Sequence, residues 1–314
     1  MARNIKNNKL QDNRLVKKFT ELYSKSESPL ALTSSSRPAS RSSELKKGHL
    51  LICYAVAGYP DTKTSKEIVS AMINSGADII EIGLPFSDPI ADGPIIQEAS
   101  FTALTRGITP DKSLEIVKDI RKEFPNTPLV AMTYSNIILK AGLRKFMKKA
   151  KDSGIDGFIL PDMPIEESDE YIKEASRLNL ATIFLVSPNT NEERLHAIAS
   201  KSSGFLYLVS VYGTTGIRKS FEDSTARYVE DTKKIVGSSI PIAVGFGISN
   251  PSHVKFMINA GADAVIVASA IINIIKNYTH GIDNNNNNSN NKKKEEMLNN
   301  VRTFVSSMKK SCKQ

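Results

Sequence analysis

The chain has 314 residues, of which 40% are hydrophobic, and this is enough for one large α/β domain or two ordinary ones. Its net charge of +9 is concentrated at the two ends. Residues 1–48 hold 11 Lys and Arg against 4 Asp and Glu, residues 276–314 hold 8 against 3, and the region between them is mildly acidic. Basic ends can hold polyanions nonspecifically, but aromatic residues do not interleave with them, which disfavours nucleic-acid binding as the main function.

No apolar run reaches membrane-spanning length, and the N-terminus lacks the apolar core of a signal peptide. The only cysteines, Cys53 and Cys312, lie far apart and predict two unpaired thiols in a reducing cytoplasm. The four histidines are scattered without zinc-ligand spacing, so we expect no metal site.

The first predicted element is a helix over residues 15–23, where apolar residues recur at helical spacing. The segment that follows, residues 25–47, is rich in Ser and Arg, and we expect a flexible insertion there. An organelle transit peptide is the alternative, because such peptides share this composition. It is the less favoured one, since a removable leader should not follow a useful helix.

From Leu50 onward, short β-rich runs alternate with amphipathic stretches. Eight runs are expected to be strands: 50–56, 79–84, 129–133, 157–160, 182–186, 205–210, 242–245 and 264–267. Helices are expected over 64–75, 113–124, 143–153, 168–178, 192–200, 226–236 and 251–260. This alternation predicts an α/β fold, a closed parallel (β/α)8 TIM barrel. An open doubly wound sheet is the alternative, weakened because no Gly-x-Gly-x-x-Gly follows the first strand.

Three of the strands are preceded by the same kind of turn: Ser75-Gly76-Ala77-Asp78, Ser153-Gly154-Ile155-Asp156 and Ala260-Gly261-Ala262-Asp263. Each Gly suits the left-handed C-cap of a helix, and each Asp suits the turn into the next strand. The recurrence supports a fold built from repeated helix-to-strand units.

The C-terminal region changes character at residues 283–291, which are almost all Asn and predict a low-complexity loop. Apolar residues from Met297 to Met308 then recur at helical spacing. They predict an extra C-terminal helix, either packed on the barrel or frayed at its surface. The chain is thus divided into an N-terminal helix with its insertion (1–48), a barrel domain (49–276), and a linker with a basic terminal helix (277–314).

The most informative stretch is residues 78–97, in which two carboxylates are candidates for catalysis. Glu81 lies inside an apolar strand, and burial of an unpaired carboxyl raises its pKa into the range of a proton carrier. Asp92 lies in a loop stiffened by Pro89 and Pro94 and should stay ionised. Carboxyls in two such environments can divide acid and base roles. The alternatives are a buried ion pair for Glu81 and helix N-capping for Asp92.

Glycine and serine gather at the ends of the last three strands, within residues 212–216, 245–249 and 268–270. Barrels often bind phosphate at this place on backbone N–H groups and a helix N-terminus; ordinary turn glycines are the alternative. Aromatic residues near the same end would suit a flat apolar substrate, with core packing as the alternative. They are Tyr134, Tyr207 and Phe246.

The stretch Glu81-Ile-Gly-Leu-Pro-Phe-Ser-Asp-Pro-Ile-Ala-Asp92-Gly-Pro resembles the signature of the tryptophan synthase alpha subunit family almost residue for residue. Further matches fall within residues 13–24 and 49–276. They include Ala57-Gly58-Tyr59-Pro60, Met132-Thr-Tyr134-Ser-Asn136, Leu160-Pro-Asp162-Met-Pro164, Tyr207-Leu-Val-Ser-Val-Tyr-Gly213-Thr-Thr-Gly216 and Gly245-Phe-Gly247-Ile-Ser249.

The resemblance implies a lyase of tryptophan biosynthesis that cleaves indole-3-glycerol phosphate into indole and glyceraldehyde 3-phosphate. By matching position, Glu81 would be the general acid/base at the indole C3 and the glycerol hydroxyl, and Asp92 would accept a hydrogen bond or proton from the indole N–H. The family's indole-pocket positions correspond to Tyr134, Tyr207 and Phe246. Its phosphate-binding positions correspond to Gly216, Gly247 and Ser269.

The family also implies no cofactor in this chain and a partner beta subunit that carries pyridoxal phosphate and receives the indole. The sequence departs from the family at Ala268, where Gly is usual, and at Cys53-Tyr54-Ala55, where Pro-Phe or Pro-Tyr is common. The alternatives are another phosphate-sugar barrel enzyme such as an isomerase, a non-catalytic partner subunit, or a polyanion binder acting through the basic ends.

Overall fold

The computed structural model describes residues 10, 12–24, 48–209, 218–245, 247–279 and 287–313. The expected insertion at 25–47 and the candidate residues Gly216 and Phe246 lie outside these ranges.

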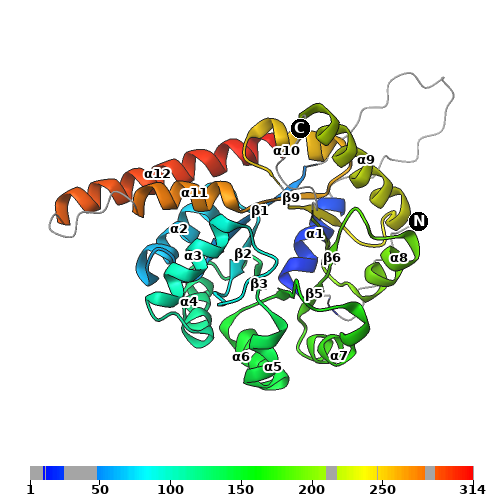
Figure 1. Cartoon of the computed structure of the whole chain (residues 1–314), viewed down its shortest axis with the longest axis horizontal. Coiled ribbons are helices and arrows are strands. Elements are labelled where there is room, and N and C mark those ends of the chain that lie inside the picture. Colours follow the sequence, from blue (N-terminus) through cyan, green and yellow to red (C-terminus); the bar gives the residue numbers. More distant parts are fainter. Residues whose placement is uncertain are drawn as a thin grey trace, which may run out of the picture.

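The described residues form one parallel sheet of nine strands that is surrounded by helices (Figure 1). The strands follow the order β5-β4-β3-β2-β1-β9-β8-β7-β6. Their bounds are β1 (Leu50–Val56), β2 (Ile79–Gly83), β3 (Leu129–Met132), β4 (Gly157–Ile159), β5 (Ala181–Ile183), β6 (Leu185–Val186), β7 (Leu206–Leu208), β8 (Ile242–Val244) and β9 (Ala264–Val267). The predicted (β/α)8 barrel is confirmed, and the doubly wound alternative is wrong.

One of the eight expected strands is interrupted, because the run expected at 182–186 is divided into β5 and β6. Strand β5 pairs with β4, whereas β6 pairs with β7. Phe184 lies between the two, and its carbonyl accepts the Tyr207 N–H at 3.0 Å. The two edges of the sheet are therefore two halves of one extended run, and this run closes the barrel.

The helices cover the outside of the barrel, except α1, which lies at one end of it. Their bounds are α1 (Arg14–Ser24), α2 (Thr62–Asn74), α3 (Pro94–Thr105), α4 (Pro110–Glu123), α5 (Ser135–Ala141), α6 (Leu143–Ser153), a 3-10 turn η1 (Ile165–Glu167), α7 (Asp169–Arg177), α8 (Glu192–Lys201), α9 (Arg218–Val236), α10 (Pro251–Asn259), α11 (Ser269–Thr279) and α12 (Asn287–Ser311). Two of these helices, α3 and α5, were not predicted from the sequence. The apolar residues of α3 lie all around the helix, and Phe101 among them is 68% exposed. Helix α5 has only seven residues.

One end of the barrel interior is closed by the N-terminal helix. Leu15, Phe19 and Leu22 of α1 are buried in the same cluster as the inward-facing residues of the strands. The Phe19 ring lies 5.7 Å from that of Phe205, centroid to centroid. Because α1 fills this end, a substrate has to enter the barrel from the opposite end, where the strands finish.

The three glycine turns before strands have the predicted left-handed conformation, with φ of 105° at Gly76, 103° at Gly154 and 101° at Gly261. The aspartates that follow them do more than turn the chain. Each carboxylate accepts a backbone N–H from the neighbouring strand and pairs with a basic side chain. The N–H donors are Leu51 for Asp78 (2.8 Å), Leu129 for Asp156 (2.9 Å) and Ile242 for Asp263 (3.0 Å). The basic partners include Lys309, Arg121 and Lys233, in the same order.

The C-terminal helix is packed on the barrel and lies beside α11 (Figure 1). Its apolar face is buried through Met297, Leu298, Val301, Val305 and Met308, so the frayed alternative is wrong. The loop expected over 283–291 is partly wrong as well, since the helix already begins at Asn287. Helix α11 continues to Thr279, past the expected domain boundary at 276.

Candidate active site

Glu81 lies on β2 with its side chain toward the barrel interior, since its neighbours Ile80 and Ile82 pack outward into the helix layer. The residue is 1% exposed, and neither carboxyl oxygen has a hydrogen-bond partner in the described part of the chain. Burial raises the pKa of Glu81 to about 8, and the nearby charge of Asp92 adds to this rise. The alternative of a buried ion pair is therefore wrong for the described residues.

Asp92 lies in the loop between β2 and α3. The N-cap of α3 is Gly93, without a side-chain capping bond, so the N-capping alternative for Asp92 is wrong. Burial raises the pKa of Asp92 to about 6, and a hydrogen bond from Tyr134 opposes this rise. The pKa of Asp92 is thus higher than its loop position suggested, although still below neutral pH. Glu81 has the higher pKa of the two carboxyls, as predicted.

Tyr134 fixes the loop that carries Asp92. Its hydroxyl accepts the Ala91 N–H at 3.1 Å and donates to the Asp92 carboxylate. Its ring stacks on Phe86 of the same loop, with centroids 5.1 Å apart. Burial and the Asp92 charge together raise the pKa of the Tyr134 hydroxyl, so it remains a donor. Sequence analysis did not identify Phe86 as a site residue, because an aromatic residue in a loop carries no periodic signal.

Two further tyrosines lie close to both carboxyls. Burial raises the pKa of Tyr54 and of Tyr207, and the charges of Glu81 and Asp92 raise both further. Tyr54 lies on β1 directly opposite Glu81 of β2. Sequence reasoning missed Tyr54 as a site residue, although its alternation with Leu50 and Ile52 places it on the inward face. The structure thus brings together Glu81, Asp92, Tyr134 and Tyr207, and adds Tyr54.

The two tyrosine rings on the strands lie across glycines. A Cβ built on Gly245 would lie 2.5 Å from the Tyr207 hydroxyl oxygen, and one built on Gly83 would collide with the Tyr54 hydroxyl. A side chain at either position would push a ring out of place, so both glycines are needed for the tyrosines to lie where they do.

We expect Gly83→Ala to lower kcat/KM by tenfold or more, on the order of what a misplaced positioning group costs. Its methyl group would displace Tyr54, which faces both carboxyls. Steady-state kinetics would measure the effect. Gly48→Ala is the matched control, because no atom lies within 4 Å of a Cβ built there and the substitution should leave kcat/KM unchanged. Equal kinetics for the two variants would contradict the role of the Tyr54–Gly83 contact.

The described candidates for phosphate binding lie at the strand ends on the same side of the barrel. Gly247 follows β8 with a φ of 62°, and Ser269 is the exposed first residue of α11. Ala268, the departure from the family pattern, packs against the main hydrophobic core. Among the described residues, no hydrogen bond joins Gly247 or Ser269 to Glu81 or Asp92.

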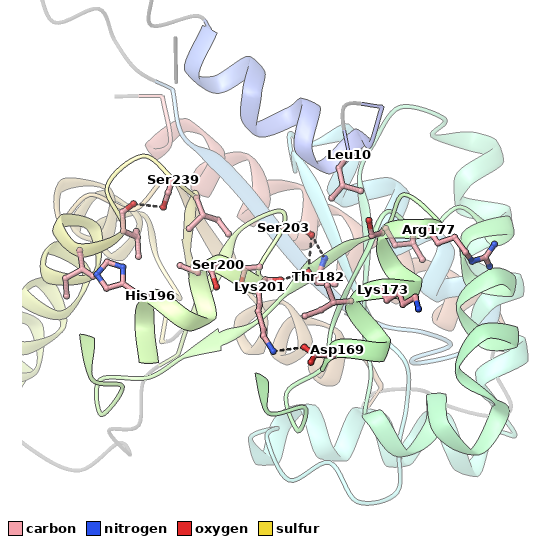
Figure 2. A pocket seen from close by; sticks show the side chains of 18 residues that line it. Leu10, Asp169, Lys173, Arg177, Thr182, His196, Ser200, Lys201, Ser203 and Ser239 are labelled. Carbon is pink, nitrogen blue, oxygen red and sulfur yellow. Dashed lines mark hydrogen bonds and ion pairs between the residues drawn. The ribbon is translucent and has the colours of Figure 1, made fainter. Parts of the chain in front are cut away.

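A cavity of about 1200 Å³ opens elsewhere, among α7, α8 and α9 (Figure 2). Its lining includes residues along α7 from Asp169 to Arg177, residues of α8 from His196 to Lys201, and the C-terminal end of α9. Lys201, one of its basic residues, already pairs with Asp169 at 2.7 Å. Neither Glu81 nor Asp92 lines this cavity, so it takes no part in the site described above.

In the ranges that the structure describes, no three His, Cys, Asp or Glu side chains are grouped so as to hold a metal ion. None of the described helices has the length and apolarity that a membrane crossing requires.

A buried carboxyl of raised pKa, beside a second carboxyl at the C-terminal end of a (β/α)8 barrel, is the arrangement that an enzyme working by acid–base chemistry requires. The family model for the tryptophan synthase alpha chain matches residues 41–313. The chain belongs to this family. It is a lyase of tryptophan biosynthesis that cleaves indole-3-glycerol phosphate to indole.

The relatives agree with this assignment over most of their length. The chain is 42% identical to the tryptophan synthase alpha chain of Methanothermobacter thermautotrophicus over 229 residues, which is 73% of this chain and 84% of that protein. It is 41% identical to that of Methanoregula boonei, over 86% of this chain and 96% of that protein.

Solved structures agree with it as well. The tryptophan synthase subunit alpha of Legionella pneumophila matches with a TM-score of 0.77 and 30% identity, covering 96% of this chain and 98% of that one. A chain of the tryptophan synthase complex of Pyrococcus furiosus matches with a TM-score of 0.72 and 35% identity, covering 83% of this chain and 98% of that one.

Proposed function

We propose that Glu81 is the general acid/base of this cleavage and that Asp92 stabilises the charge on the indole nitrogen. The single observation that carries the proposal is the buried Glu81 carboxyl, which has a pKa of about 8 and no partner among the described residues. At neutral pH such a group holds a proton that it can donate, and nothing competes for that proton.

The reaction needs two proton transfers that one group can perform in turn. Protonated Glu81 donates its proton to C3 of the indole, and the ring becomes an indolenine with positive charge on nitrogen. The Glu81 carboxylate then takes the proton from the hydroxyl on the glycerol carbon that is bonded to C3. As this oxygen forms the C=O of the aldehyde, the bond between C3 and the glycerol carbon breaks. The electron pair of that bond neutralises the indolenine, and indole and the aldehyde are released.

Asp92 supports the first step from the nitrogen side. Its pKa of about 6 keeps it mostly ionised at pH 7, so it can accept the indole N–H as that group gains charge. Tyr134 holds the carboxylate in place through its hydroxyl. Binding is assigned to the positions that match the family. Tyr134, Tyr207 and Phe246 would contact the indole. Gly216, Gly247 and Ser269 would bind the phosphate through backbone N–H groups and a helix N-terminus.

The partner is proposed to be a tryptophan synthase beta subunit in an alpha2-beta2 type complex, which carries pyridoxal phosphate and receives the indole. The neighbour from Pyrococcus furiosus, a tryptophan synthase complex, supports this pairing.

No cofactor is assigned to this chain. A cytoplasmic location is proposed from its two buried free thiols, Cys53 and Cys312. Incubation with indole-3-glycerol phosphate, with and without a beta subunit, tests the assignment. Release of no indole in either case would favour another barrel activity.

The pH profile of kcat/KM should be bell-shaped, with an acid limb near pH 6 from Asp92 and an alkaline limb near pH 8 from Glu81. The Tyr134 hydrogen bond lowers the pKa of Asp92, so Tyr134→Phe should raise that pKa and move the acid limb to higher pH. The alkaline limb should stay where it is. An unmoved acid limb in the Tyr134→Phe enzyme would remove Asp92 from the profile.

A further inference from the structure

His253 lies in the first turn of α10 and reaches back to the glycine turn that follows β8. Its ring Nδ1 lies 2.9 Å from the carbonyl oxygen of Gly247, and its Nε2 lies 2.9 Å from the side-chain Nδ2 of Asn250. The imidazole therefore bridges the start of the helix and the turn. No mechanism described above uses it.

The neighbouring contacts determine where the proton of this imidazole lies. The Oδ1 of Asn250 accepts the His253 N–H at 3.0 Å and the Ser252 hydroxyl at 2.5 Å, and this fixes the orientation of the amide. The Nδ2 group of Asn250 must then donate to Nε2, which has to be unprotonated. The proton lies on Nδ1, and the imidazole donates it to the Gly247 carbonyl. The Ser249 N–H also points at Nδ1, but at 3.4 Å it is a much weaker contact than the one of 2.9 Å to the Gly247 carbonyl, which decides the tautomer.

This hydrogen bond holds one peptide plane of the turn. Gly247 has a φ of 62°, in the left-handed region where glycine is free to move. The carbonyl of Gly247 and the N–H of Ile248 belong to the same peptide and point in opposite directions. Ile248 is buried at 5% exposure and anchors the other side. With the carbonyl held by His253, the direction of the Ile248 N–H is set before any ligand arrives.

We propose that His253 is a positioning residue that orients the Gly247 turn for the phosphate of the substrate. This rests on the proposed role of Gly247 in phosphate binding. A purely structural role is already filled by another group, since Asn250 caps the helix through the backbone N–H of His253, which any residue at 253 would keep. The ring acts on the turn and leaves the cap untouched.

Two variants of nearly equal size separate these roles. His253→Asn keeps an N–H donor near the Gly247 carbonyl, whereas His253→Leu keeps the volume without the donor. We expect His253→Leu to raise the KM for indole-3-glycerol phosphate by roughly threefold to tenfold, the effect of one lost hydrogen bond, with kcat little changed. Inorganic phosphate should inhibit it more weakly by a similar factor, and indole should inhibit as before. His253→Asn should resemble the wild type.

Each outcome decides a different point. An unchanged KM and unchanged phosphate inhibition in His253→Leu would overturn the role of His253. An equal loss of phosphate and indole inhibition would show a general structural defect and overturn it too. Gly247→Ala tests the proposed phosphate site on its own, because its strained φ disturbs the turn directly. If phosphate inhibits Gly247→Ala as strongly as the wild type, the assignment of Gly247 fails, whatever His253 does.

Discussion

Glu81→Gln should reduce kcat by about 10²- to 10⁴-fold, the range that a positioned acid/base supplies, while the fold stays intact. The amide has nearly the shape of the carboxyl but cannot give up a proton to C3 or accept one from the glycerol hydroxyl. Release of indole from indole-3-glycerol phosphate under saturating substrate would measure the change. A Glu81→Gln enzyme that retains more than a tenth of the wild-type kcat would remove Glu81 from the proton transfers.

The stability of the same variant provides its control. The folded-state pKa of Glu81 is about 8, above its ordinary value of 4.5, so the folded chain keeps a proton that the unfolded chain releases. The free energy of unfolding of the wild type should therefore fall as the pH rises from 4.5 to about 8, by up to about 1.4 kcal/mol per pH unit. Gln has no proton to lose, and Glu81→Gln should be at least as stable as the wild type at pH 8. A loss of activity then cannot come from unfolding.

The barrel could be predicted from the sequence because its strands and helices each carry a local period. Strands β1 and β9 begin and end where their apolar runs do, and helix α6 matches its amphipathic stretch residue for residue. The division of one run into β5 and β6 could not be predicted. It depends on which neighbour each half pairs with across the barrel, and this is a property of the closed sheet rather than of residues 182–186.

The site was predictable to the extent that its residues conflict with their local setting. Glu81 is conspicuous because a charge in an apolar strand needs a reason. Tyr54 is not, since an aromatic residue in a buried strand is what a core also contains, and only its register opposite Glu81 distinguishes it. The raised pKa of Asp92 was missed for a related reason. Its loop is polar in sequence, and the burial comes from the fold around it.

Asp156, one of the aspartates that precede a strand, has contacts that could not be predicted from the sequence. Asp156 is 1% exposed and pairs with Arg14 of α1 and Arg121 of α4, each at 2.8 Å. It also accepts the Leu129 N–H of β3 at 2.9 Å. One carboxylate thus joins the N-terminal helix, a surface helix and a strand at the closed end of the barrel. The sequence suggested only a turn residue there.

Asp156→Ala should destabilise the chain by about 3–5 kcal/mol, because the largely buried Arg121 guanidinium loses the carboxylate that balances its charge and the Leu129 N–H loses its side-chain acceptor. Urea unfolding at pH 7 would measure it. Asp152→Ala is the matched control, since its pair with Lys148 is more than half exposed on both sides and should contribute less than about 1 kcal/mol. If the two variants unfold at the same urea concentration, the buried pairs do not hold this end together. Asp156 lies at the end of the barrel opposite Glu81, so the folded fraction of Asp156→Ala should keep its kcat; a fall in kcat without unfolding would mean that α1 also shapes the catalytic end.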